Sequence, residues 1–388
     1  MKITQIYELM NTTVKEVLGT ETIVNEDLSN IVDIGNEIIS TENVDNYVKK
    51  LVNHIGKVVF SDRVYTGSAP TVLMDSWEFG SILEKVTAEL PTATENESWN
   101  LQDGKEYSPD IFYEPKVSAK FYNSKITFEI PLSFTELQVK ESFSNQNQLN
   151  GFLSMLYNSV DKAMTVKLDG LVMKTINNMI AETVYNDLYN KTDKALKLDK
   201  GSIKAVNLLA EYTAKTGNTV TVDKALTDPD FIRFASYTIN VYKDRLTKLS
   251  TLFNVGGKER FTTSDYLHVV LLSNFASSTD IYLNSDVQHN ELVKLPNFET
   301  VPYWQGSGLT YDFDDITSID VKTQSGAIVK MNGILGVMFD RESLGVANLD
   351  KRVTTNYNPK AEFYTNFYKL DAGYYNDLNE NFVVFYIA

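Results

Sequence analysis

The sequence contains no cysteine and only three histidines, His54, His268 and His289, which lie far apart along the chain. The absence of cysteine excludes disulfide bonds, thiolate zinc sites and cysteine nucleophiles. The scattered histidines include no HExxH pair, so we predict no histidine-rich metal centre. The chain therefore lacks the residue groupings on which many metal-dependent and covalent enzymes depend.

Motifs for cofactor binding are also missing. The segment GGK at 256–258 is followed by Glu259 and has no earlier glycine at the spacing of a phosphate-binding loop. The segment GSG at 306–308 lacks the third glycine of a dinucleotide-binding turn, and no GxSxG motif occurs. We therefore predict no cofactor and no catalytic residues.

Positive charge and long apolar runs are both scarce. The chain has 36 Lys and Arg against 51 Asp and Glu, a formal net charge of −15. This balance argues against nucleic-acid binding by neutralisation of phosphates. No uninterrupted apolar run approaches about 18 residues, and the N-terminus has no apolar signal-peptide core, so we predict no membrane association.

What the sequence does have is length and apolar content. Its 388 residues are 43% hydrophobic and 12% aromatic, enough for two or three domains with a sizeable core. The strongest periodic signal is a long helix over 147–184, where apolar residues recur every three or four positions.

The first half of the chain contains segments that do not resemble a compact domain. Residues 1–60 predict short helices that form an arm. Residues 91–110 are polar and acidic without periodicity, which favours a long functional loop. Strand-like alternation on its far side changes parity at 123–124, which implies a turn or bulge there. We therefore predict a long two-stranded excursion over 81–132.

The second half alternates predicted strands and helices. We expect helices over 203–216 and 228–250, the second with Asp228 as N-cap before Pro229. Strands are expected at DYLHVVLL, FETVPYW and GAIVKMNGILGVMFD, and a helix at SNFASSTDIYL. The apolar strand FVVFYIA at the end of the sequence is expected to return to the sheet that carries the long helix.

Two charged groups are candidates for chemistry. The cluster Asp312, Asp314 and Asp315 suits a hard cation, but a solvated acidic face is the alternative that we favour. Asp340, Arg341 and Glu342 follow a buried apolar run, where they could be catalytic. An arginine beside two carboxylates more often forms a turn or an interface ion pair, so we predict that role and no enzyme activity.

The order of these segments resembles the major capsid protein of tailed bacteriophages with the HK97-like fold, and most closely the short-tailed phi29-like group. The matching stretches are FYEPKVSAKFYNSKITFEIPLSFTEL before the long helix, then FETVPYWQG, GILGVMFDRESLGV and TTNYNPKAEFYTNFYKLDAGYYNDLNENFVVFYIA. The resemblance implies an α+β fold and a structural protein of the virion capsid, assembled in the cytoplasm of a bacterial host.

The resemblance also implies a division of the chain. Residues 1–60 would be the N-terminal arm, and 61–202 the peripheral domain, which includes the extended E-loop hairpin (81–132) and the spine helix (147–184). Residues 203–348 would be the axial α/β domain, and 349–388 would return to the peripheral domain. The E-loop tip, lying over an adjacent subunit, would include Glu97, Trp99, Asp103 and Lys105.

The expected partners follow from the same resemblance. They are other copies of the chain in pentamers and hexamers, a separate scaffolding protein and a portal, with double-stranded DNA enclosed without sequence-specific binding. An encapsulin-like compartment shell is one alternative. A soluble α/β enzyme with lid insertions is another, and it would be a monomer or dimer with a pocket of converging polar groups.

Overall fold

A computed structural model describes residues 67, 69–74, 83–135, 146–284, 295–305 and 316–388. The predicted N-terminal arm and the Asp312–Asp315 cluster lie outside these residues. The chain divides into two compact units. One comprises Met1–Tyr65, Pro131–Lys162 and Thr354–Phe367, and the other comprises Thr66–Ile130, Ala163–Val353 and Tyr368–Ala388.

The longest element is helix α5, Gln146–Leu188, which confirms the helix predicted over 147–184. At 1.5 Å per residue it is about 65 Å long. Its second half belongs to the larger unit, where Ile176, Met179 and Ile180 are fully buried. These residues lie three and four positions apart, on one face of the helix, and join the main hydrophobic core.

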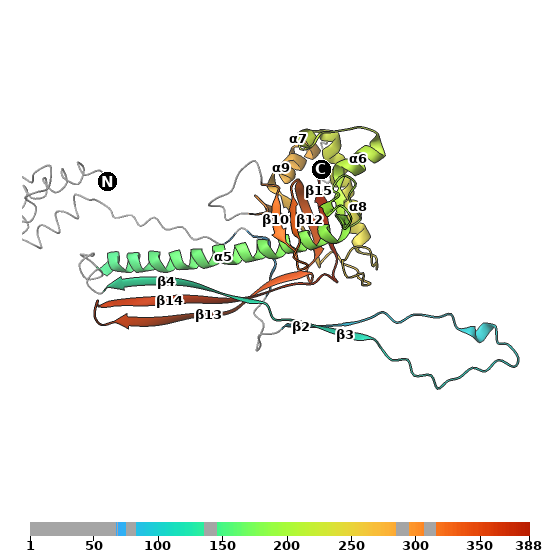
Figure 1. The fold of residues 1–388 in the computed structure, drawn as a ribbon, viewed down its shortest axis with the longest axis horizontal. Coiled ribbons are helices and arrows are strands. Elements are labelled where there is room, and N and C mark those ends of the chain that lie inside the picture. Colours follow the sequence, from blue (N-terminus) through green and yellow to red (C-terminus); the bar gives the residue numbers. More distant parts are fainter. Residues whose placement is uncertain (1–66, 68, 75–82, 136–145, 285–294, 306–315) are drawn as a thin grey trace, which may run out of the picture. The chain divides into compact units, whose positions relative to one another are not determined.

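The centre of the larger unit is a five-stranded sheet in the order β7-β15-β12-β8-β9 (Figure 1). Its strands are β7 (Ala205–Asn207), β15 (Phe382–Tyr386), β12 (Ile334–Asp340), β8 (Leu267–Leu272) and β9 (Glu299–Val301). Strand β12 is antiparallel to both β15 and β8, whereas β7 and β9 join as parallel outer strands. Every residue of β12 and β15 is buried, as expected for strands covered on both faces.

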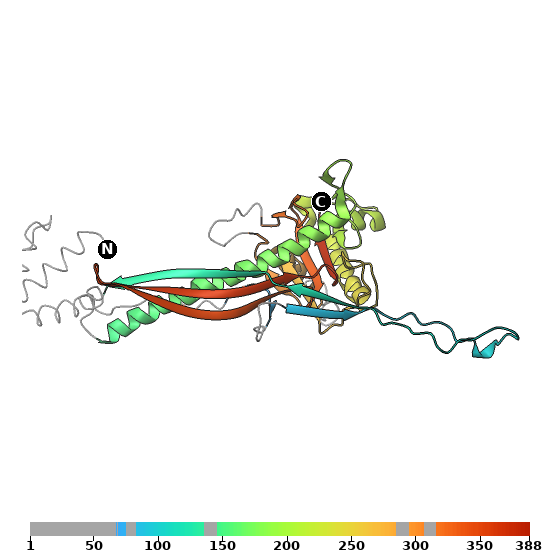
Figure 2. The same ribbon diagram turned by 60° about the horizontal axis from the view of Figure 1, so that its bottom comes forward.

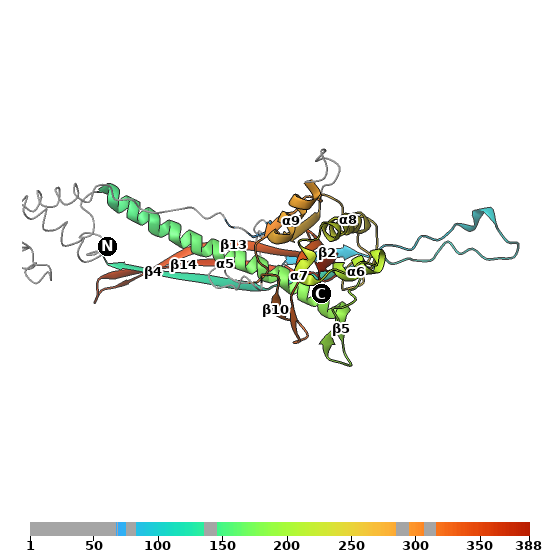
Figure 3. The ribbon, with the colours of Figure 1, turned by 90° about the horizontal axis from the view of Figure 1, so that it is seen from above.

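Four helices accompany this sheet: α6 (Leu208–Thr216), α7 (Val222–Ala225), α8 (Pro229–Leu246) and α9 (Ser273–Asn284). Asp228 caps α8 as predicted, because its side chain accepts a 2.8 Å hydrogen bond from the Phe231 amide. Helices α8 and α9 pack side by side (Figure 3). The Phe385 ring of β15 meets the Tyr242 ring of α8 edge to face at 5.4 Å, so α8 covers this side of the sheet.

The remaining strands form smaller sheets. A four-stranded sheet has the order β1-β13-β14-β4, with bounds Leu73–Met74, Leu344–Asn358, Phe363–Asn376 and Lys125–Thr135. Pairs are formed by β2 (Leu83–Ala88) with β3 (Val117–Tyr122), β5 (Tyr189–Asn190) with β6 (Ala195–Leu196), and β10 (Ile319–Lys322) with β11 (Ile328–Met331). A short 3-10 helix, η1, spans Glu97–Trp99.

Four sequence predictions need correction. The expected strand GAIVKMNGILGVMFD is two strands, β11 and β12, because Gly333 adopts a φ of 76° between them. A Cβ at Gly333 would lie only 2.1 Å from the Ile387 carbonyl oxygen, so only glycine fits there. The segment expected as a helix over 203–216 begins with strand β7 before α6 starts at Leu208.

The other two corrections concern strand partners. The hairpin expected over 81–132 is shorter, because its second strand ends at Tyr122. Residues from Lys125 onward form β4, which belongs to the four-stranded sheet. The final strand, β15, was predicted to return to the peripheral domain, but it lies between β7 and β12, among strands of the range predicted as the axial domain (203–348). Its full burial explains this position, since the middle of a covered sheet buries an apolar strand on both faces.

Candidate subunit interface: an exposed hairpin loop and the ion cluster at its base

Among the described strands, β2 and β3 form an antiparallel hairpin that joins no larger sheet. Its register places Leu83 opposite Tyr122, Lys85 opposite Lys120 and Ala88 opposite Val117. Along β2 the side chains alternate between half-buried and exposed. The exposed face carries apolar side chains such as Val86, and nearly all of β3 is exposed. An isolated two-stranded hairpin is marginal in water, so this one depends on contacts beyond its own ladder.

Beyond the strands, every residue of loop 89–116 is exposed. Figure 2 shows the loop running away from β2 and β3, with η1 near its far end. Large apolar side chains are frequent in it, and Trp99 is 97% exposed. The others are Leu90, Leu101, Tyr107, Ile111, Phe112 and Tyr113. Several exposed large apolar side chains in one segment are typical of interaction surfaces.

Local contacts give the far end of the loop some internal order. Asn96 caps η1 by accepting a 2.8 Å hydrogen bond from the Ser98 amide. Lys105 forms an ion pair with Glu97. The Lys105 ammonium also lies 5.2 Å from the centre of the Tyr107 ring, within the range of a cation–π contact. The loop therefore holds a defined turn although it packs on no core.

The structure brings together only part of the predicted tip group. Glu97 and Lys105 are paired, whereas Trp99 points into solvent. Asp103 precedes Gly104, whose φ of 78° closes the turn in which the Lys105 amide donates to the Gln102 carbonyl at 3.3 Å. The sequence analysis did not single out Phe112 and Tyr113, which are the next most exposed large apolar side chains of the loop.

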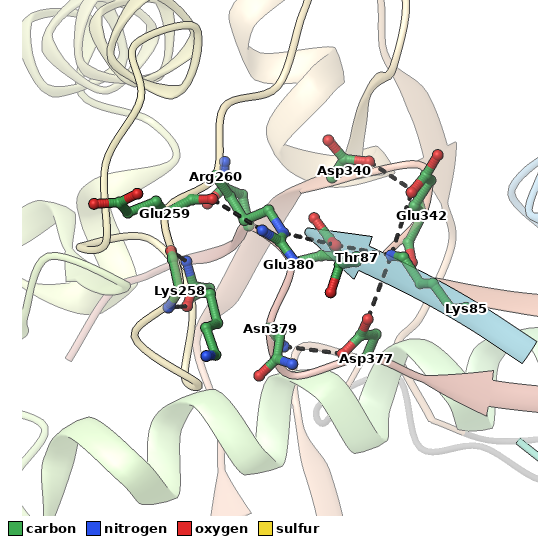
Figure 4. Close-up of polar contacts among 12 residues, drawn as sticks. Lys85, Thr87, Lys258, Glu259, Arg260, Asp340, Glu342, Asp377, Asn379 and Glu380 are labelled. Carbon is green, nitrogen blue, oxygen red and sulfur yellow. Dashed lines mark hydrogen bonds and ion pairs between the residues drawn. The ribbon is translucent and has the colours of Figure 1, made fainter. Parts of the chain in front are cut away.

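The base of the hairpin is held by a cluster of charges, of which only Glu342 was among the residues predicted from the sequence. The Lys85 ammonium lies 2.8 Å from Glu380, 3.2 Å from Glu342 and 3.3 Å from Asp377 (Figure 4). Arg260 approaches Glu380 from the other side at 2.9 Å. Lys85 and Arg260 thus share the Glu380 carboxylate, and the Lys85 ammonium is surrounded by three carboxylates.

Asp377 connects the two strands of the hairpin. Its carboxylate is 3.3 Å from Lys85 of β2 and 2.8 Å from Lys120 of β3. These lysines are directly opposite in the register, where like charges repel unless an anion separates them. The Asp377 side chain is only 2% exposed, so little water screens these interactions.

The carboxylates come from a turn with fixed backbone geometry. The Asp377 amide donates to the Ser343 carbonyl at 2.6 Å, and the Asp377 side chain accepts from the Asn379 amide at 3.1 Å. The Glu380 amide donates to the Asp377 carbonyl at 3.2 Å. The turn between β14 and β15 therefore presents both acids to the hairpin from a rigid position.

The charges in this cluster shift one another's pKa values. Burial alone would raise the pKa of Asp377, but the hydrogen bond from Lys120 and the charge of Lys85 outweigh burial and hold that pKa below its usual range. Burial likewise opposes the charged form of Lys85, yet its hydrogen bond to Glu380 and the neighbouring carboxylates raise its pKa. Both groups are therefore held in their charged forms.

The predicted group Asp340, Arg341 and Glu342 forms the turn between β12 and β13. Asp340 is buried, and its carboxylate accepts hydrogen bonds from the Thr262 hydroxyl at 2.7 Å and the Glu342 amide at 2.9 Å. Burial raises the pKa of Asp340 despite these hydrogen bonds. Glu342 turns toward Lys85, and Arg341 is exposed, with no ion pair among the residues that the structure describes.

Within the described ranges, no group of three or more His, Cys, Asp or Glu side chains is arranged to hold a metal ion. None of the described helices is both long and apolar enough to cross a bilayer. The charged residues at the hairpin base form ion pairs with one another. They therefore make a structural contact rather than a pocket with free acids and bases.

The fold defines the class of protein. The chain is similar to a protein in the capsid structure of Staphylococcus phage Andhra, with 9% identity, a TM-score of 0.53, and coverage of 86% of this chain and 87% of that one. It is also similar to a chain in the structure of the head fiber and inner core protein gp22 of native bacteriophage P68. There the identity is 9% and the TM-score 0.52, with 86% and 88% of the two chains covered. The fold is thus the HK97-like capsid fold.

The family follows from the sequence. The family model of the Phi29-like phage major capsid protein matches residues 10–386, so the chain belongs to this family. It is a structural protein of the virion capsid and not an enzyme, which sets aside the predicted alternatives of a compartment shell and an α/β enzyme. No curated protein matches the chain.

Proposed function

We propose that copies of this chain assemble as pentamers and hexamers into an icosahedral-type shell around double-stranded DNA, with loop 89–116 lying over a neighbouring copy. The observation that carries this proposal is the loop itself. It exposes Trp99, Phe112 and Tyr113 in the single subunit, while the base of its hairpin is anchored in the larger unit.

The energetic argument favours a protein surface as the partner of the loop. Full burial of one large apolar side chain contributes about 1.5–3 kcal/mol, and aromatic residues are enriched at the centres of interfaces. The Glu97–Lys105 pair and Asp103 would lie beside Trp99 at the polar rim. Several such side chains on each copy, repeated around a closed shell, would supply enough contact area for stable assembly.

A second contact is proposed at the turn between β12 and β13. Asp340 is committed to the turn and Glu342 to the hairpin base, but the exposed Arg341 is available for a neighbour. An arginine can bind a carboxylate through two parallel hydrogen bonds, which fixes geometry as well as charge. The acidic surface of an adjacent copy would suit it, since the chain carries a net charge of −15.

The partners other than the chain itself are a separate scaffolding protein and a portal. The net negative charge suits a container for packed DNA, because a wall that attracts phosphates would trap the DNA against it. The DNA would accordingly be enclosed without sequence-specific contacts.

Assembly with and without a co-expressed scaffolding protein tests the proposal. Negative-stain electron microscopy and size-exclusion chromatography should show closed shells or rings for the wild type. The double variant Trp99→Ala, Phe112→Ala should need at least about tenfold more subunit to assemble, because about 1.4 kcal/mol changes an equilibrium constant tenfold.

The matched control is Trp99→Phe, which keeps an aromatic ring at the tip and should retain most assembly. Thermal unfolding of the unassembled double variant should match the wild type, because the two replaced side chains are exposed. A wild-type chain that stays a monomer or dimer in both conditions would overturn the shell proposal. Normal shells from the double variant would overturn the role of the loop.

A further inference from the structure

We propose that Asp377 and Glu380 form an anchor that sets the direction in which the β2–β3 hairpin leaves the larger unit. The inference rests on the proposed contact of loop 89–116 with a neighbouring copy, because the direction of the hairpin decides where that loop arrives. Asp377 and Glu380 are positioning residues that would act without touching the neighbour themselves.

No backbone hydrogen-bond ladder extends from the hairpin to another described strand. Strands β2 and β3 pair with each other and form a separate two-stranded sheet. Beyond the chain connection from β3 to β4, where the Tyr374 amide donates to the Ser124 carbonyl at 3.1 Å, the described links to the rest of the unit are side-chain contacts, most of them at the base of the hairpin. Lys85, Lys120 and Tyr122 make these contacts, the last through its ring, 4.9 Å from the ring of Tyr375.

The ion pairs at the base of the hairpin involve both of its strands. One ion pair would act as a pivot about which the hairpin could swing. Here Asp377 binds a lysine from each strand, and Lys85 additionally binds Glu380 and Glu342. Figure 4 shows the Lys85 ammonium between these three carboxylates. Contacts on both strands, directed at two different acids of one turn, resist rotation as well as translation of the hairpin.

The cluster differs in burial from the neighbouring Glu89–Lys258 pair. Farther along the hairpin, Glu89 binds Lys258 at 2.8 Å, but these side chains are 44% and 41% exposed, whereas those of Lys85 and Glu380 are 15% and 7% exposed. Exposed pairs of this kind contribute little, whereas a buried acid loses much if its partner is removed. Asp377 and Glu380 are the buried members, so the orientation of the hairpin depends on them rather than on the Glu89–Lys258 pair.

Removing one partner of a buried ion pair is strongly destabilising, because it leaves an uncompensated buried charge. Asp377 keeps both of its lysine partners only when the hairpin lies in the observed register and direction, whereas Glu380 also has Arg260. Another position of the hairpin would leave buried Asp377 without cations, and that cost selects the observed one. The cluster therefore specifies geometry, which is what a repeated subunit contact requires.

Distance measurement between two spin labels tests the anchor in the unassembled subunit. The chain has no cysteine, so the pair Ser98→Cys and Asn218→Cys introduces the only two attachment sites. Position 98 is at the loop tip, and position 218 is an exposed site after α6 in the same unit. The otherwise unchanged chain should give one narrow distance distribution in pulsed electron paramagnetic resonance.

Asp377→Asn should broaden this distribution, because the neutral amide no longer balances Lys85 and Lys120. The matched control is Asp187→Asn, which also breaks a largely buried aspartate–lysine pair, with Lys204 at 2.9 Å, but away from the hairpin. That variant should keep the narrow distribution. A distribution for Asp377→Asn as narrow as that of the control would overturn the proposal.

Two gentler variants cover the case in which Asp377→Asn does not fold. Lys120 is partly exposed, so Lys120→Gln removes one side of the anchor with little risk to the core, and Lys120→Arg keeps the charge. The glutamine variant should broaden the distribution and lower the yield of shells, whereas the arginine variant should do neither. An unchanged distribution in Lys120→Gln would also overturn the anchor.

The two proposals fail in different ways. The spin-label distances are measured on single subunits, so they report on the anchor whether or not shells form. Loss of the narrow distance together with normal shells would show that the anchor exists but does not govern assembly, which overturns its positioning role. Absence of shells from every chain, including the wild type, would instead overturn the proposed shell.

Discussion

Two antiparallel strand pairs in the larger unit use opposite means of support. Strands β12 and β15 bury every residue, and the rings of Phe339 and Phe382 stack between them at 5.5 Å. Strands β2 and β3 expose most of their side chains and are held at one end by lysines and carboxylates. The first pair is stable through burial within one chain, whereas charge orients the second in the anchor that we propose.

The difference separates two requirements of a shell protein. The core must be stable in every copy regardless of its neighbours, which apolar burial achieves without directional demands. For the proposed contact with a neighbouring copy, the hairpin must point in one direction while its apolar surface remains available, so burying that surface within the subunit would prevent the contact. Charges at the base can direct the hairpin without covering it.

The largest expected effect on the free energy of unfolding comes from the buried strands β12 and β15. Phe385→Ala in β15 removes a fully buried ring packed against Tyr242, and it should lower the free energy of unfolding by about 3–5 kcal/mol. Urea denaturation of the unassembled subunit measures this change. A loss of less than about 1 kcal/mol would show that the sheet is not the main source of stability.

An effect of intermediate size is expected when a fall in pH protonates Asp377 at the base of the hairpin. The pKa of Asp377 is lowered in the folded state, so its contribution to stability is complete above its ordinary pKa and is lost as pH falls through the lower folded value. Asp340 has a raised pKa, so its protonation favours folding and has the opposite sign. The two effects are separable because only Asp377 contacts the hairpin lysines.

Hydrogen exchange of the β2–β3 amides between pH 6 and pH 3 measures the effect, after correction for the intrinsic exchange rate. Protection should hold down to the ordinary pKa of an aspartate, 3.8, and fall below it. Asp377→Asn should show low protection throughout and little change with pH. Protection that falls equally in wild type and variant would contradict a role for Asp377.

The smallest effect is expected from a phenylalanine on the exposed pair. Phe121 of β3 is 64% exposed, so Phe121→Ala should change the free energy of unfolding of the single subunit by no more than about 0.5 kcal/mol. Urea denaturation beside Phe385→Ala gives a matched comparison of one residue type in two strand pairs. A loss as large as that of Phe385→Ala would show that the hairpin is part of the core.

Much of the fold could be predicted from local pattern. Helix α5 was predictable because its apolar residues recur on one face, and the start of α8 because Asp228 precedes Pro229. The break at 123–124 appeared as a change of parity between two alternating runs, and β3 and β4 do separate there. These features depend on neighbours in sequence, which is the information that a single sequence carries.

The ion cluster could not be predicted, because its members are distant in sequence. Lys120 and Asp377 are 257 positions apart, and Lys85 and Glu380 are 295 apart. Nothing in either segment distinguishes these residues from other surface charges. The position of β15 was missed for the same reason, since its partners depend on how β7 and β12 are arranged in space. The roles of Trp99 and Arg341 at an interface stay predictions.

The position of β15 has a consequence for how the subunit is made. Synthesis proceeds from the N-terminus, so β7 leaves the ribosome long before β15, its partner in the five-stranded sheet. The turn that carries Asp377 and Glu380 immediately precedes β15 and emerges equally late. A nascent chain therefore gains a closed core and a directed hairpin at nearly the same moment. With the proposed anchor, this timing would limit premature contacts between incomplete subunits, because a hairpin without its anchor has no fixed direction.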